Sequence, residues 1–180
     1  ESQLNPFVFP AIGVSTPINE KLRFGIGMYV VSGLCADYKG TSLPPLYTQL
    51  QTMKFAPNLA WLITPDFSVG ASVEVVWQNL DLGQGATHDY ALGLQLGVLY
   101  RLGKFNIGAS YTTPESVTHK NVSDFNDPSG ELHDLEIESP HTFKFGVAFE
   151  PNTSVLLEVY SRWYGWGSAA GYKDFGWDDQ

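Results

Sequence analysis

The four histidines are the side chains best suited to acid–base or metal chemistry, and their spacing supports neither. They are scattered along the chain, at His88, His119, His133 and His141. None of them is paired at the i, i+4 spacing of a helical zinc site. The sequence also lacks the Gly-x-Ser-x-Gly segment of a serine nucleophile and any phosphate-binding glycine loop. We therefore expect no enzyme, no metal site and no cofactor.

Two further candidates are weaker. The segment 119–134 contains oxygen-bearing side chains that could bind calcium, but Pro128 interrupts the EF-hand spacing, so we expect a solvated acidic loop. Its members are Asp124, Asn126, Asp127, Glu131 and Asp134. Cys35 is the single cysteine, which excludes a disulfide framework. We interpret it as a small residue near a strand end, with a reactive thiol as the alternative.

Charge and hydropathy narrow the class of protein. The 180 residues carry a net charge of −9, which argues against nucleic acid as a partner, because phosphates need a Lys/Arg surface. No apolar run approaches the roughly 20 residues of a membrane-spanning helix. The longest are pieces such as LAWLI at 59–63, so a membrane role would have to use strands.

The elements that must position any site are strands. In FSVGASVEVVWQ, residues 67–78, every second residue is apolar, which predicts a strand with two different faces. Similar alternation predicts eight strands, at about 7–18, 22–36, 54–64, 67–80, 90–102, 105–118, 135–150 and 153–164. Their connections are alternately short (INEKL, TPDF, LGKF, EPNT) and long and polar. This sidedness is typical of an outer-membrane barrel.

The parity of the charges agrees with a membrane. Apolar side chains share one face of each strand, so Phe67 to Trp77 are expected to face lipid and Glu74 the lumen. All charges within the strands take the lumen parity: Arg23, Lys54, Glu74, Arg101, Lys144, Glu150, Glu158 and Arg162. A cation on the lipid face would cost roughly 2–4 kcal/mol. The core of a soluble β-sandwich would impose the same parity, so that fold stays open.

The lumen face is rich in glycine and other small residues, such as Gly25, Gly27, Gly93 and Gly97, as a curving wall requires. Aromatic residues near strand ends suggest an interfacial girdle, with ordinary packing as the alternative. They are Tyr29, Tyr111, Trp163, Tyr164 and Trp166.

Four stretches resemble one family of outer-membrane transporters. They are LRFGIGMYVVSGLCADY, MKFAPNLAW, GASYTTPESVTHK and GYKDFGWDDQ, and the similarity runs in order over most of the chain. They are similar to the FadL/TodX-type transporters of long-chain fatty acids and aromatic hydrocarbons. The resemblance implies an all-β, antiparallel, up-and-down transmembrane barrel of about fourteen strands. Residues 1–180 would supply about eight strands as a single barrel segment, lacking the N-terminal hatch and the C-terminal strands.

The resemblance also implies a function and a location. We expect passive uptake of hydrophobic or amphipathic small molecules through the lumen, in the bacterial outer membrane, with membrane lipid around the barrel. A fatty carboxylate in the lumen would need a cation, because an unpaired buried charge is costly. The candidates are the lumen-parity cations Arg23, Lys54, Arg101, Lys144 and Arg162. For each, pairing with Glu74, Glu150 or Glu158 is the competing interpretation.

Proline suggests a kink in the first strand. The resemblance includes a kinked wall strand that opens the lumen sideways, and proline cannot donate to a strand ladder. We therefore expect the kink at Pro10 to Gly13, or else a strand that begins only after Pro10.

Two other functions stay open: a self-contained eight-stranded structural or adhesive barrel acting through its long loops, and a lipid hydrolase. Protein partners are not predictable.

Overall fold

The computed structural model describes residues 8–37, 47–83, 85–123 and 131–180. Ten strands account for most of them, with two short 3₁₀ turns near the C-terminus. The strands are β1 (Ala11–Pro17), β2 (Leu22–Asp37), β3 (Tyr47–Thr64), β4 (Phe67–Asp81), β5 (Ala86–Leu102), β6 (Phe105–Thr112), β7 (Glu115–Ser123), β8 (Leu132–Ser139), β9 (Thr142–Asn152) and β10 (Val155–Tyr164); the turns are η1 (Trp166–Ser168) and η2 (Lys173–Phe175). No helix in the described segments is long and apolar enough to cross a membrane.

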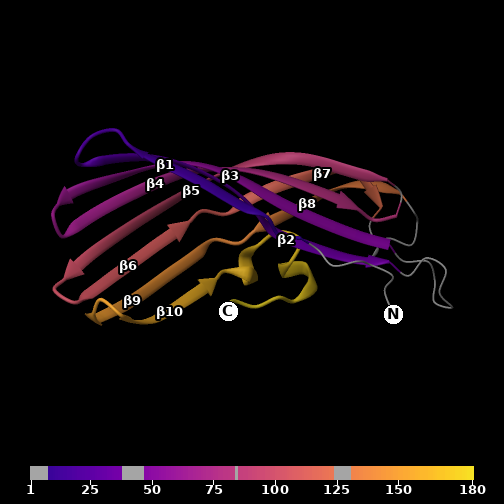
Figure 1. The fold of residues 1–180 in the computed structure, drawn as a ribbon. Coiled ribbons are helices and arrows are strands. Elements are labelled where there is room, and N and C mark those ends of the chain that lie inside the picture. Colours follow the sequence, from indigo (N-terminus) through magenta and orange to yellow (C-terminus); the bar gives the residue numbers. More distant parts are fainter. Residues whose placement is uncertain (1–7, 38–46, 84, 124–130) are drawn as a thin grey trace.

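Eight strands form one antiparallel sheet in the order β1-β2-β3-β4-β5-β6-β9-β10. The sheet curls strongly, and the C-terminal segment lies on its concave side (Figure 1). Within the described residues β1 and β10 do not pair with each other, so the sheet is an open, curved wall. The predicted all-β up-and-down architecture is confirmed, whereas a closed eight-stranded barrel is not what these strands form.

The register confirms the predicted faces. Met28, Phe55, Val75 and Leu92 lie side by side on neighbouring strands, as one row of the convex face. The side chains on this face are exposed although apolar: Leu92 is 72% and Val159 77% exposed. By contrast, the largest fully buried side chains include His119, Glu74 and Glu115. Apolar residues outside and charged residues inside are the reverse of a soluble β-sandwich, and they match a wall that faces lipid.

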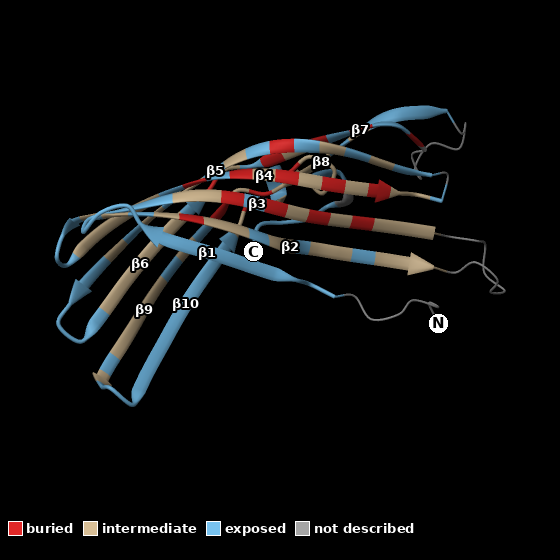
Figure 2. Ribbon diagram, turned by 45° about the horizontal axis from the view of Figure 1, so that its top comes forward, coloured by how far each residue is buried: buried red, intermediate tan, exposed pale blue. Residues whose placement is uncertain are grey.

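The strands extend further toward the long-loop side than the alternation predicts. β3 begins at Tyr47 rather than near residue 54, and β5 at Ala86 rather than near residue 90. About 9–11 residues suffice for a strand to cross a membrane, so strands of 15–18 residues continue beyond it. In Figure 2 the buried residues of the wall concentrate on β3 and β4, from the middle of these strands toward the long-loop side.

Two predicted wall strands are interrupted, which corrects the ranges 105–118 and 135–150. β6 ends at Thr112 and β9 begins at Thr142, and these two residues are paired. Pro114 comes two residues after Thr112, and Pro140 two residues before Thr142. Proline has no N–H group to donate to a strand ladder. Beyond them the chain forms a separate two-stranded sheet, β7–β8 (Figure 1).

The predicted aromatic girdle is partly wrong. Tyr111 and Trp163 lie on the outer face, each paired with Phe143 in the register. The other three residues have the lumen parity or follow the last strand. Tyr29, Tyr164 and Trp166 all line a cavity on the concave side.

Candidate functional site

A cavity of about 440 Å³ lies on the concave side of the wall, beside the β7–β8 hairpin and the C-terminal segment. Wall strands β2 to β6, β9 and β10 contribute residues to it. Most of its lining side chains are polar or charged, including Thr52, Gln78, Gln95 and Thr112. Three cations line it as well, and all three belong to the predicted set: Lys54, Lys144 and Arg162.

The other two predicted cations lie elsewhere. Arg23, near the start of β2, pairs with Ala60 in the register, and Arg101, near the end of β5, pairs with Asn106. Both have the lumen parity but belong to the short-turn end of the wall, outside this cavity. The structure therefore brings together three of the five predicted residues.

Lys54 lies in a buried ion cluster. Its ammonium nitrogen is 3.4 Å from Glu74 Oε2 and 2.6 Å from Glu115 Oε2. The Tyr29 hydroxyl donates to Glu74 Oε2 at 2.9 Å, whereas Glu74 Oε1 has no hydrogen-bond partner among the described residues. For Lys54, pairing with Glu74 was the competing interpretation, and it is confirmed.

Glu115 belongs to β7 rather than to the membrane-spanning wall. Burial raises the pKa of its carboxyl above the ordinary value, Lys54 opposes this shift, and Glu74 adds to it. One ammonium thus faces two carboxylates, with no further described cation within 4 Å.

Lys144 and Arg162 are directly opposite each other on β9 and β10. No ion pair within 4.0 Å involves either of them in the described part of the chain. The Arg162 guanidinium lies 5.1 Å from the centre of the Tyr160 ring. Like charges directly opposite repel each other, and a bound anion would relieve this. Among the described residues, these two are the cations of the cavity without an acidic partner, and Arg162 also interacts with the Tyr164 side chain.

Aromatic rings line the same end of the cavity. Trp166 follows Tyr164 at a ring-centre distance of 6.2 Å and packs edge-on against Tyr172 at 4.6 Å. Trp177 completes the group, 5.1 Å from Trp166. The backbone of Gln180 pairs with that of Tyr164, which holds this segment against the end of β10. The cavity therefore combines unpaired cations with flat apolar surfaces.

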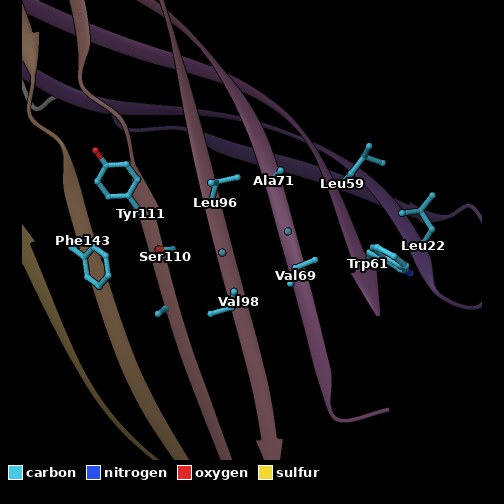
Figure 3. Close-up of a pocket in the computed structure, with 13 residues that line it drawn as sticks. Leu22, Leu59, Trp61, Val69, Ala71, Leu96, Val98, Ser110, Tyr111 and Phe143 are labelled. Carbon is cyan, nitrogen blue, oxygen red and sulfur yellow. The ribbon is translucent and has the colours of Figure 1, made fainter. Parts of the chain in front are cut away.

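A second, shallower depression lies on the outer face. It has a volume of about 610 Å³ and spans β2 to β6 and β9. Figure 3 shows Trp61, Val69, Leu96, Tyr111 and Phe143 around it, and its floor is made by small residues such as Ala71. It has no charged lining residue, which suits a surface in contact with lipid chains.

The predicted kink falls at the edge of the sheet. β1 begins at Ala11 and pairs with β2 in unbroken register through Gly13 to Pro17, so no bulge occurs at Gly13 on that side. The Pro10 carbonyl still accepts a hydrogen bond from the Val30 amide at 3.2 Å. Residues 1–7 lie outside the described part. A strand that starts after Pro10 accounts for this geometry, and a lateral opening here stays a prediction.

The remaining chemistry-bearing residues are dispersed. His119 is fully buried and its Nε2–H donates to Gln78 Oε1 at 3.0 Å, while His141 packs against Trp163. Of the acidic loop, Asp124, Asn126 and Asp127 lie outside the described residues, and Asp134 accepts a hydrogen bond from the Asn121 amide. No group of three metal-ligating side chains occurs in the described segments. Cys35 is a free, half-buried thiol.

Sequence reasoning did not identify Glu115, Tyr172 or Trp177. The available signal for Glu115 was Pro114, which ends the wall strand immediately before it. A second signal was Gly93: a Cβ at this position would lie 2.6 Å from the Glu115 side chain, so β5 needs glycine where β7 crosses it. Neither signal indicates the direction in which the chain turns.

Comparisons with known proteins agree on one architecture. The chain matches a Pseudomonas aeruginosa FadL homologue with a TM-score of 0.68 at 14% identity, covering 88% of this chain and 48% of that one. It matches the P. putida toluene transporter TodX with a TM-score of 0.69 at 18% identity, covering 93% and 56%. The chain thus spans about half the length of these solved structures. Curated proteins yield no significant match.

At these identities the solved structures establish the fold. The sequence itself matches the family model described as outer membrane protein transport protein (OMPP1/FadL/TodX) over residues 2–155. The predicted resemblance is confirmed, and with it the location in the bacterial outer membrane and the absence of an enzymatic role at the level of the family. The chain belongs to the OMPP1/FadL/TodX family of outer-membrane transport proteins.

Proposed function

We propose that the protein containing this chain lets hydrophobic or amphipathic small molecules pass passively across the outer membrane, with the concave cavity as part of the route. The family supports transport of hydrophobic compounds in general. The observation that carries the proposal for this chain is the pair Lys144 and Arg162, two unpaired cations beside Tyr164, Trp166 and Tyr172.

The chemistry of this pair suits an amphipathic carboxylate. Two cations can hold the carboxylate by charge-assisted hydrogen bonds, and the aromatic rings can cover the adjacent apolar part of the ligand. Long-chain fatty acids have this form, and apolar hydrocarbons would use the aromatic surface alone. Passage would follow the concentration gradient.

The test is binding of a fluorescent long-chain fatty acid to the complete protein in detergent. Replacing both Lys144 and Arg162 with Met should weaken binding about tenfold or more, since hydrogen bonds to charged groups contribute about 1.5–3 kcal/mol. The matched control is Arg23→Met together with Arg101→Met, which removes two lumen-parity cations outside the cavity. Equal affinity in both double variants would contradict the proposed site.

The same assay addresses the alternative of a structural or adhesive barrel. That alternative predicts no saturable binding of fatty acids or toluene-like solutes by the complete protein.

The proposed lateral opening at Pro10 to Gly13 needs a separate experiment. A disulfide that ties this segment to a neighbouring strand should slow release into the membrane while leaving binding unchanged.

A further inference from the structure

The β7–β8 hairpin lies against the inner wall along its whole described length. Successive inward side chains of β7 each meet a partner on the wall. Glu115 contacts Lys54, Val117 is buried with Val76 and Ala91, His119 donates to Gln78, and Val122 is buried with Leu50 and Leu80. β7 therefore runs alongside the extensions of β4 and β5, on their lumen side.

Two features separate the hairpin from the wall ladder. Thr113 and Leu94 exchange two hydrogen bonds of 3.0 Å, and the ladder stops there because Pro114 follows. On the returning strand Pro140 has the same effect, and Ser139 pairs with Glu115 across the hairpin. The two strands thus leave the wall together, and the hairpin enters the lumen as a unit.

The hairpin also forms part of the cavity. Glu115 and Ser139 line it from the hairpin side, opposite Tyr164 and Trp166 of the C-terminal side. The width of the cavity therefore depends on how closely the hairpin is held to β4 and β5.

Lys54 is the charged contact that holds it there. Its ammonium bridges Glu74 on the wall and Glu115 on the hairpin, and all three side chains are nearly inaccessible to solvent. With two carboxylates already facing one ammonium, a further anion at this position would meet net negative charge. Lys54 is therefore poorly suited to bind a ligand carboxylate, unlike Lys144 and Arg162.

We propose that Lys54 is a positioning residue, which fixes the β7–β8 hairpin to the inner wall through Glu115 and so limits the size of solute that can pass. This inference rests on the proposed function, because it assigns a size limit to the same route. Without Lys54, the buried carboxylates of Glu74 and Glu115 have no cation beside them, and the hairpin loses its charged contact with the wall.

The test measures hairpin position and passage separately. A single thiol is placed at Ala91→Cys, under Val117, in complete protein whose other cysteines, Cys35 included, are serine. Lys54→Met and Glu115→Ala should each raise the rate of labelling by a water-soluble maleimide about tenfold or more, because each removes the link between the wall and the hairpin. Lys54→Arg should keep the slow rate. Arg101→Met, another cation on the same face, is the matched control and should also label slowly.

In liposomes, the same two variants should raise the uptake of a bulky polycyclic hydrocarbon relative to toluene. Joining Val76→Cys to Val117→Cys with a short thiol cross-linker should restore the original ratio in the Lys54→Met protein, which a merely unstable barrel would not show. Unchanged labelling in both variants would overturn the inference, as would an unchanged uptake ratio despite faster labelling. If no solute passes the unaltered protein while labelling still depends on Lys54, the transport proposal fails instead, together with the size limit.

Discussion

Replacing Gly93 with alanine tests the contact between β5 and the hairpin most directly. The added Cβ would lie 2.6 Å from both Cγ and Oε1 of Glu115. That is about 1 Å closer than an ordinary carbon contact, so Glu115 would have to move. Its carboxylate is also held by Lys54, with Nζ only 2.6 Å from Oε2, so the movement would stretch this ion pair.

The matched control is Gly97→Ala, on the same strand and the same face. There the nearest atoms, the Ala109 carbonyl oxygen and Ser110 Cβ, would lie 3.7 and 3.8 Å from the new Cβ, which is ordinary contact. Both substitutions stiffen the unfolded chain equally, an effect of about 0.4–1 kcal/mol. The difference between them therefore isolates the crowding at Glu115.

We expect Gly93→Ala to lower the free energy of unfolding by about 1–3 kcal/mol relative to Gly97→Ala, the usual cost of overpacking. The measurement is reversible urea unfolding of the complete protein from lipid vesicles, followed by tryptophan fluorescence. In a Glu115→Ala background the difference should vanish, because the obstructing side chain is gone. If the two alanine variants of the unaltered background agree within about 0.5 kcal/mol, β7 does not press on Gly93 as described.

Three further predictions concern other parts of the wall. Val98→Arg, on the lipid face, should destabilise the protein by about 2–4 kcal/mol in vesicles, whereas Leu99→Arg, on the lumen face, should cost far less. Lys144→Met should weaken carboxylate binding yet stabilise the ligand-free protein by roughly 0.2–1 kcal/mol, because it removes a like charge opposite Arg162. Burial lowers the pKa of His119, so its contribution to hairpin attachment is complete above the unfolded value near 6.5 and is lost as the pH falls through the folded value. Maleimide labelling at Ala91→Cys should therefore accelerate more on acidification with His119 present than in His119→Gln; an equal response would contradict this role.

The two faces of the wall could be predicted from the sequence because strand parity is strict. Each apolar row, such as Met28, Phe55, Val75 and Leu92, had to fall on one side once the short turns fixed the hairpins. The lumen cations followed from the same rule. Parity alone could not show whether lipid or a protein core covers the apolar face. The burial of Glu74 and His119 on the opposite face supports lipid.

The inward hairpin could not be predicted, because its alternation resembles that of a wall strand. Val117 continues the lipid-facing parity of the predicted strand 105–118, yet it packs on Val76 inside the lumen, and Val122, beyond that predicted strand, packs on Leu80. Proline marks where a ladder ends but not where the chain goes next. The candidate site was predictable as a set of cations, with Glu74 as a possible partner of Lys54. Glu115, Tyr172 and Trp177 were not predictable, because they belong to segments that the sequence does not place against the inner wall.

The alternation of faces has a consequence for how the chain reaches its membrane. Half of each wall strand is polar or small, so the mean hydropathy is only −0.10 although the convex surface is almost wholly apolar. A continuous apolar segment of roughly 20 residues would be retained as a helix in the cytoplasmic membrane during export. This chain places its apolar side chains at every second position of a strand. They form a continuous apolar surface only when the strands pair. The apolar surface that meets lipid therefore exists only in the assembled sheet and in no single segment of the sequence.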